Sequence, residues 1–268
     1  MMGSPVVTML TDFGLRDPYV AEMKAVILSL CPNARIVDIS HMIEKFNVRM
    51  GAFVLASAAP YFPKGTIHIA VVDPGVGTKR RALLVETNEA FYIGPDNGVL
   101  VLAARKQKIK HAYNLTNKRF MLSKVSTTFH GRDIFAPAAA YLANGFKLND
   151  FGKEIKDYCI PKFAKPNLGK DGLVGEVLHA DDFGNVITNI SQDDLDKIGA
   201  VRDSKMKIRL GKKVAQVRFG SVYGEARAGA VVALVGSHDF LEIAVNQGHA
   251  ARHFGTRAGD TVFIELSR

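Results

Sequence analysis

The stretch Thr66-Ile67-His68-Ile69-Ala70-Val71-Val72-Asp73-Pro74-Gly75 decides the class of the fold. Residues 66–72 form an almost continuous apolar run, which is typical of a strand buried on both faces of a sheet. The run ends at an Asp-Pro-Gly turn sequence. Similar runs at 6–10 and 35–39 alternate with segments of helical period. This alternation predicts a layered α/β domain in the first half of the chain.

Helices are expected between these strands. Asp17-Pro18 is typical of an N-cap followed by proline at the first helical position, and Pro32 stops the helix that it opens. A second helix is expected at 47–59, ended by Pro60. Further strands are predicted at 82–86 and 91–93, and further helices at 98–105 and 133–144.

The second half of the chain has a different texture. Prolines and glycines interrupt residues 159–172, which we interpret as a linker. Beyond it, strand-like runs dominate, at 173–179, 185–190, 214–219, 230–235, 240–245 and 261–266, with one helix at 191–198. The sequence therefore predicts an N-terminal α/β domain at 1–158 and a smaller β-rich domain at 173–268, a barrel or a sandwich.

The composition is that of an ordinary globular protein, with 47% hydrophobic and 23% charged residues. No apolar run approaches the length of a membrane span and no secretory leader is visible, so we expect a cytoplasmic protein without membrane contact. The two cysteines are too few for a disulfide framework or a thiolate zinc site. The net charge of +9 comes without interleaved aromatic residues, so nucleic acid is not expected as a partner.

Polar clusters follow the predicted strands at their carboxyl ends, where α/β sheets usually hold ligands. Asp12 and Asp17 follow the first strand, Asp73 follows the third, and His130 opens a helix. A carboxylate, an arginine and a histidine brought together in this way can orient and polarise a water molecule.

The arginine of such a trio is Arg80 or Arg81, and spacing alone leaves a purely structural interpretation open. Asp73 can simply end a strand, His130 can cap a helix, and Arg80 can pair on the surface. A metal site built on His130 and Asp133, one helical turn apart, is disfavoured because no second compact pair completes a cage.

Six segments along the chain carry a resemblance to a known family. They are Val7–Gly14, Val72–Gly77, Ile93–Gly98, Phe129–Asp133, Asp182–Ile190 and Leu241–Asn246. Together and in this order, they make the chain resemble the S-adenosyl-L-methionine hydroxide adenosyltransferases, the hydrolytic relatives of the fluorinase and the chlorinase. Each motif alone is weak, but the set is highly specific and spans nearly the whole chain.

The resemblance implies an N-terminal α/β domain, a C-terminal β-barrel domain, and hydrolysis of S-adenosyl-L-methionine to adenosine and L-methionine. It also implies a homotrimer that binds its ligand between the N-domain of one subunit and the C-domain of its neighbour. Asp73, Arg80 and His130 correspond to the water-activating triad of the family. Neither a metal nor an organic cofactor is implied.

The resemblance further implies a set of substrate contacts. Asp12 would grip the ribose hydroxyls, and Asp17 would face the methionine portion. The second domain would supply Asp181 to the ammonium group, Phe183 and Asn185 to adenine, Ser237 to the methionine carboxylate, and Glu242 with the backbone near Val245 to the nucleoside. The plain alternatives are a helix cap for Asp17, a turn acid for Asp181 and an exposed strand residue for Glu242.

Two other functions stay open. The first is a halogenase-type transferase, but fluorinase-like relatives carry a tyrosine in place of Asp73, and a carboxylate there would repel a halide while ordering water. The second is a non-catalytic adenosine or S-adenosyl-L-methionine sensor, against which the presence of all three triad positions argues.

Overall fold

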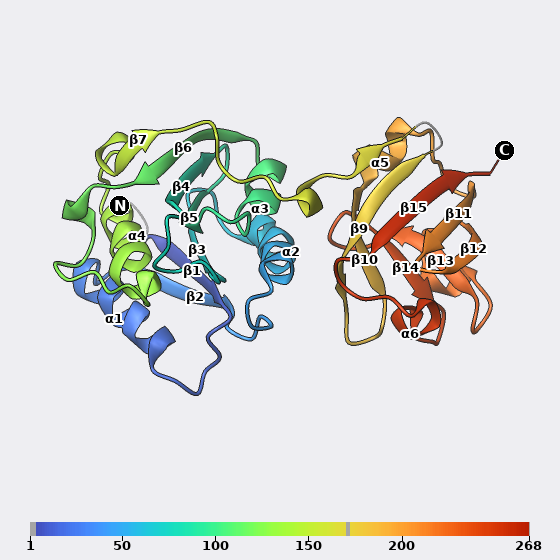
Figure 1. Cartoon of the computed structure of the whole chain (residues 1–268), viewed down its shortest axis with the longest axis horizontal. Helices are drawn as coiled ribbons and strands as arrows, with labels where there is room; N and C mark the ends of the chain where they lie inside the picture. Colours follow the sequence, from blue (N-terminus) through green and yellow to red (C-terminus); the bar gives the residue numbers. More distant parts are fainter. Residues whose placement is uncertain (1–3, 170–171, 268) are drawn as a thin grey trace. The chain divides into compact units, whose positions relative to one another are not determined.

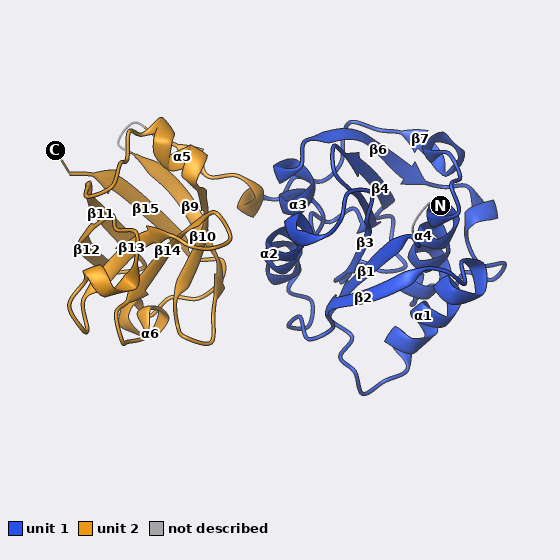
Figure 2. Cartoon of the chain, turned by 180° about the vertical axis from the view of Figure 1, so that it is seen from behind, with its two compact units in different colours: residues 1–161 blue, residues 162–268 orange. Residues whose placement is uncertain are grey.

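The computed structural model describes residues 4–169 and 172–267, so Lys170 and Asp171 of the expected linker lie outside the described residues. The chain divides into two compact units, one ending at Pro161 and the other beginning at Lys162 (Figure 1, Figure 2). Each unit has its own hydrophobic core. In the part of the chain that is described, no helix is long and apolar enough to cross a membrane.

A mixed sheet forms the centre of the first unit. Among the described residues its spatial order is β2 (Arg35–Ser40), β1 (Val6–Thr11), β3 (Ile67–Val71), β5 (Phe91–Pro95), β4 (Ala82–Thr87), β6 (Ile109–Leu115) and β7 (Gly152–Glu154). The neighbours from β2 to β5 pair in parallel, and the other neighbours pair antiparallel. Thr11 at the end of β1 pairs with Val71 at the end of β3. This register places the loops that begin at Asp12 and near Asp73 side by side at one edge of the sheet.

Helices cover both faces of this sheet (Figure 1). They are α1 (Tyr19–Leu30) and α4 (Ala136–Ala143) on one face, and α2 (Val48–Ala58) and α3 (Val101–Lys106) on the other. Met23 of α1 joins a core with Val7 of β1. On the opposite face Gly51 permits the close approach of α2, because a Cβ there would lie 2.9 Å from Val72 Cγ2. The predicted layered α/β architecture is confirmed.

The starts of two helices differ from expectation. The N-cap of α1 is Pro18 and no side chain caps it, so the interpretation of Asp17 as an N-cap is wrong. Asp17 lies one residue too early to reach the first free amides of the helix. The helix expected at 133–144 opens with a π-helical turn, Gly131–Phe135, that runs into α4. It ends before Gly145, whose φ of +86° suits a helix terminus.

The second unit is a curved, mainly antiparallel sheet. Its strands are β8 (Asn167–Leu168), β9 (Leu173–Ala180), β10 (Val186–Ser191), β11 (Lys205–Leu210), β12 (Lys213–Arg218), β13 (Val231–Val235), β14 (Phe240–Val245) and β15 (Thr261–Leu266). They follow the order β12-β11-β15-β9-β10-β14-β13, with β8 beside β9. A bridge from Phe219, just after β12, to Ala233 in β13 joins the two ends of this order. The sheet is therefore a nearly closed barrel, as the resemblance implied.

Short helices complete the structure. The second unit carries α5 (Gln192–Lys197) and α6 (Ala250–Phe254), and 3₁₀ turns lie at Ala59–Tyr61, Lys118–Phe120, Leu148–Asp150, Lys162–Ala164 and Tyr223–Glu225. Ser191 and Asp194 form a capping box at the start of α5, within the helix predicted at 191–198. The strands β6, β7, β8 and β11 and the helix α6 were not predicted. For β11 the signal exists, because Lys205–Leu210 alternates strictly between exposed and buried residues.

Candidate active site

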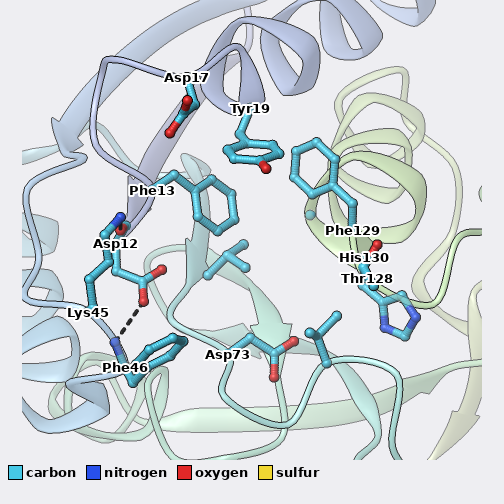
Figure 3. A pocket seen from close by; sticks show the side chains of 13 residues that line it. Asp12, Phe13, Asp17, Tyr19, Lys45, Phe46, Asp73, Thr128, Phe129 and His130 are labelled. Carbon is cyan, nitrogen blue, oxygen red and sulfur yellow. Dashed lines mark hydrogen bonds between the residues drawn. The ribbon is translucent and has the colours of Figure 1, made fainter.

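A pocket of about 350 Å³ lies at the sheet edge where β1 and β3 end (Figure 3). This volume falls within the range of roughly 300–1,000 Å³ that is usual for small-molecule sites. The lining residues are Asp12, Phe13, Asp17, Tyr19, Lys45, Phe46, Val71, Asp73, Val76, Thr128, Phe129, His130 and Gly131. Four residues singled out in the sequence, Asp12, Asp17, Asp73 and His130, are thus brought to one cavity.

Asp73 and Arg80 form an ion pair at this pocket. Arg80 Nε lies 3.0 Å from each carboxylate oxygen of Asp73, and Arg80 Nη2 also donates to Oδ2. The two side chains are only 5% and 10% exposed, so solvent screens their attraction little. Arg81 instead binds Asp96 and Asp157. Of the two arginines left open by the sequence, Arg80 is therefore the partner of Asp73.

His130 accepts a hydrogen bond from the same arginine. Arg80 Nη2 lies 2.9 Å from His130 Nδ1. A guanidinium can only donate, so Nδ1 accepts and the neutral ring carries its proton on Nε2. Burial lowers the pKa of His130, and the charge of Arg80 lowers it further against the opposing effects of Asp73 and Asp133. These effects favour the neutral ring that the hydrogen bond requires.

A glycine brings the two loops of this trio together. Gly77 has a φ of +76°, and a Cβ there would lie 2.3 Å from the carbonyl oxygen of Thr127. The loop after β3 therefore lies directly against the segment that leads to His130. Only glycine combines this backbone conformation with so close an approach.

A buried carboxylate anchors the segment that carries His130. Asp133 accepts hydrogen bonds from the Ser126 amide at 2.8 Å and from Arg132 Nε at 2.7 Å. Arg132 in turn donates to Glu22 of α1 at 2.7 Å. Burial raises the pKa of Asp133, but the hydrogen bonds from Arg132 and Ser126 outweigh it and lower the pKa overall. The network ties the His130 segment to a rigid helix.

Asp12 is held by a segment that the sequence did not point to. Its carboxylate faces the pocket and accepts a hydrogen bond from the Phe46 amide at 2.8 Å (Figure 3). Lys45 Nζ donates to the Asp12 carbonyl oxygen. Phe46 has a φ of +64°, rare for a residue with a side chain, and the residue is 67% exposed. Such strain is often found at functional sites. Because 33 residues separate Lys45 from Asp12, no local motif signals the contact.

Aromatic rings form the apolar wall of the pocket. Phe13, Tyr19 and Phe129 meet edge to face, with ring centroids 5.2–5.8 Å apart. Asp12 and Asp73 lie away from Tyr19 and Phe129, whereas Asp17 lies beside Tyr19 (Figure 3). A wall of rings facing a few fixed polar groups is suited to an organic ligand that has an apolar and a polar part.

In the second unit, Asp181 and Asn185 belong to one turn. Asp181 accepts hydrogen bonds from the Asn185 backbone amide at 2.8 Å and from its side-chain amide at 3.1 Å. Phe183, between them, is 80% exposed. Asp181 is thus a turn acid, and its contacts orient the side chain of Asn185.

Glu242 is buried, 7% exposed, so its interpretation as an exposed strand residue is wrong. It accepts a hydrogen bond of 2.5 Å from the Tyr223 hydroxyl. Burial raises the pKa of Glu242, and the nearby charge of Asp181 raises it further against the effect of Tyr223. Ser237 lies in the exposed turn between β13 and β14, and Val245 is buried at the end of β14.

Metal-binding geometry is absent from residues 4–169 and 172–267, where no group of three or more His, Cys, Asp or Glu side chains could hold an ion.

Two family models match the chain. The N-terminal domain of the SAM hydroxide adenosyltransferases matches residues 7–152, and the C-terminal domain matches residues 175–263. The chain belongs to the SAM hydroxide adenosyltransferase family. The resemblance seen in the sequence motifs is therefore confirmed.

Relatives of this chain match it over nearly their full lengths. It is 38% identical to an (R)-S-adenosyl-L-methionine hydrolase of Salinispora tropica, covering 98% of this chain and 99% of that one. A crystal structure of an uncharacterised conserved protein from Thermotoga maritima superposes with a TM-score of 0.85 at 38% identity, covering 96% and 99% of the two chains.

A fluorinase of Nocardia brasiliensis is more distant, 30% identical and covering 98% of this chain and 97% of the fluorinase. That alignment spans 291 positions against the 268 residues of this chain, a difference of at least 23. The fluorinase therefore carries residues that have no counterpart here.

Proposed function

We propose that the chain hydrolyses S-adenosyl-L-methionine to adenosine and L-methionine. Similarity to (R)-S-adenosyl-L-methionine hydrolases over the whole chain supports the reaction class. Within the pocket, the observation that favours water as the nucleophile is the carboxylate of Asp73, which forms an ion pair with Arg80. A fixed negative charge repels halide ions but accepts hydrogen bonds from water.

In this mechanism Asp73 orients the attacking water. Each carboxylate oxygen has two acceptor positions, so lone pairs remain beyond those that Arg80 uses. The water oxygen attacks C5′ of the substrate, and the C5′–S bond breaks with its electron pair going to sulfur. The sulfonium becomes the neutral thioether of methionine, so the leaving group needs no proton. The proton lost from water passes to Asp73 and then to solvent.

Arg80 and His130 hold this carboxylate in position. The guanidinium fixes the plane of Asp73, and His130 Nδ1 accepts from the same Nη2 group. Since Nδ1 accepts from Arg80, Nε2 carries the ring proton and is a donor, so His130 serves to orient rather than to take the proton. Holding water in line with the C5′–S bond lowers the barrier by positioning the nucleophile before reaction.

Substrate contacts are proposed on the same basis. Asp12 would bind the ribose hydroxyls, and Asp17 the methionine portion. The second unit would bind the rest of the ligand through Asp181, Phe183, Asn185, Ser237, Glu242 and the backbone near Val245. We also propose that the active form is a homotrimer whose site combines the first unit of one subunit with the second unit of its neighbour. The reaction as written needs no cofactor.

Incubation of the purified chain with S-adenosyl-L-methionine in heavy-oxygen water tests the reaction. The expected products are methionine and adenosine labelled at the 5′-hydroxyl, detected by mass spectrometry. A halogenated nucleoside formed when chloride or fluoride is present would instead indicate a halogenase-type transferase. Tight binding of adenosine without turnover would indicate a sensor.

A further inference from the structure

The loop that carries Asp12 is supported from behind by polar groups that the proposed reaction does not use. Thr11 is fully buried, and its Oγ1 lies 2.8 Å from His41 Nδ1. His41 Nε2 lies 3.1 Å from Asp38 Oδ1. Lys24 donates to the other oxygen of Asp38 at 2.6 Å. A series of polar contacts thus runs from Thr11, which precedes the pocket residue Asp12, to the partly exposed side chains of Asp38 and Lys24.

The proton positions in this series follow from its two ends. The Phe13 amide donates to Thr11 Oγ1 at 3.2 Å, so the hydroxyl is an acceptor there and has its own proton to give to His41 Nδ1. Burial raises the pKa of Asp38, but Lys24 and His41 outweigh it and lower the pKa overall. A carboxylate facing Nε2 favours the tautomer with the proton on Nε2. Nδ1 is then left to accept from Thr11.

The backbone of the same segment clamps the loop a second time. The Gly14 amide donates to the His41 carbonyl at 2.8 Å. Phe46 and Lys45 hold the carboxylate and the carbonyl of Asp12. Residues 41–46 therefore contact the loop 11–14 at Thr11, Asp12 and Gly14.

We propose that His41 is a positioning residue that fixes the loop 11–14 through Thr11, and so sets the Asp12 carboxylate for the ligand. His41 itself does not line the pocket. The consequence for the ligand rests on the proposed function, in which Asp12 binds the ribose. The consequence for the loop depends only on the contacts described.

The same sheet contains a matched control. Thr8 Oγ1 lies 2.7 Å from His68 Nδ1, and both residues are fully buried. This pair links β1 to β3 and makes no contact with the loop 11–14. Thr8→Val and Thr11→Val therefore remove equivalent hydroxyl groups, only one of which supports Asp12.

Two replacements of His41 separate its two contacts. The amide of asparagine occupies the place of Nδ1, and the amide of glutamine occupies the place of Nε2. His41→Asn therefore keeps the contact with Thr11, whereas His41→Gln keeps the contact with Asp38. If His41 only filled space, the effects of the two variants on loop exchange and adenosine binding would follow their effects on protein stability.

The experiment combines hydrogen exchange of the ligand-free protein with adenosine titration calorimetry. Thr11→Val and His41→Gln should speed exchange of the Phe13 and Gly14 amides and weaken adenosine binding, each by about tenfold. Thr8→Val should leave both quantities at wild-type values, whatever its effect on thermal unfolding, and His41→Asn should disturb both less than His41→Gln does. Turnover should show the loss mainly in KM.

Unchanged exchange at Phe13 and Gly14 in Thr11→Val would overturn the proposal, as would equal effects of His41→Asn and His41→Gln. If exchange responds as expected but the wild-type protein neither binds adenosine nor turns over substrate, the proposed function fails and the positioning role of His41 stands.

Discussion

Arg80 contacts more functional groups than any other side chain described at the site. Its Nε and Nη2 bind Asp73, Nη2 also binds His130, and its Nη1 donates to the Arg81 carbonyl at 3.3 Å. Its guanidinium also lies 5.3 Å from the ring centroid of Phe135. A lysine has neither the planar fork nor the reach for these contacts. The geometry of the trio therefore depends on a guanidinium.

Asp73→Asn should abolish most turnover while leaving adenosine affinity near the wild-type value. The amide keeps the shape of the carboxylate but lacks its charge. It therefore neither orients the attacking water as the carboxylate does nor accepts its proton. The expected loss in kcat is roughly a hundredfold to ten-thousandfold. Stopped-time product assays and calorimetry measure the two quantities.

Arg80→Lys should lower kcat in the same direction. Arg81→Lys is the control, because Arg81 binds Asp96 and Asp157 rather than Asp73. Near-normal turnover of Asp73→Asn would remove this carboxylate from the mechanism.

The pH dependence of kcat/KM should report the neutral state of His130. Burial and the charge of Arg80 lower the pKa of this ring below its ordinary value of 6.5. Protonation would place a hydrogen on Nδ1 and break its bond with Arg80. Activity should therefore stay level as the pH falls through 6.5 and decline only below it.

His130→Asn keeps an acceptor for Arg80 but does not titrate, so its acidic decline should disappear. A decline centred at or above pH 6.5 in the wild-type protein would contradict this role of His130.

At the scale of elements, the loops after β1 and β3 were predictable and their supports were not. The apolar runs that form β1 and β3 end in polar residues, and parallel pairing brings those ends together. Both the apolar runs of the strands and the turn residues that follow them can be identified in the sequence. By contrast, Phe46 contacts Asp12 from a left-handed backbone conformation, which a phenylalanine in the sequence does not predict.

Residue spacing alone also could not predict whether Arg80 or Arg81 binds Asp73. Adjacent residues in a loop can point either way, and here Arg80 binds Asp73 whereas Arg81 binds Asp96 and Asp157. The error at Asp17 has a similar origin. Proline stands at the N-cap of α1 itself, so the acidic residue before it falls outside the helix and lines the pocket.

Gly77→Ala should impair catalysis as well as stability. The added Cβ would meet the Thr127 carbonyl at 2.3 Å in a backbone with φ +76°, so the loop must shift and carry Arg80 away from His130. Gly65→Ala is the matched control, because Gly65 has a φ of +84° but nothing lies within 4 Å of its Cβ position.

In Gly65→Ala, only the backbone strain of a non-glycine residue at positive φ should lower the free energy of unfolding, by about 1–3 kcal/mol. The variant should keep its kcat. Chemical denaturation and steady-state kinetics on both variants measure these effects. Equal kcat values for the two variants would show that the approach of the loops does not control catalysis.

At the scale of the whole molecule, the residues assigned to substrate are divided between two units with separate cores. Asp12, Asp17, Asp73, Arg80 and His130 belong to the first, and the remaining six residues belong to the second. Composition and turn sequences predicted two domains of these classes. They carry no information on how many chains complete one site.

A homotrimer should appear in light scattering at three times the chain mass of 29.2 kDa. Coexpression of Asp73→Asn with Asn185→Ala, each inactive alone, tests whether a site is shared between subunits. In randomly mixed trimers, each half of a shared site is intact with probability one half, so about a quarter of wild-type activity should return. No recovery, or a fully active monomer, would rule out the shared site.

The Asp73–Arg80 ion pair also restricts the evolutionary history open to this protein. Losing either partner first leaves a buried charge unmatched, which costs about 3–5 kcal/mol, a large share of the roughly 5–15 kcal/mol that keeps a typical domain folded. We therefore expect positions 73 and 80 to change together rather than singly. A change of nucleophile that replaces Asp73 alone is therefore expected to need either a second change at position 80 or stability gained elsewhere in the molecule.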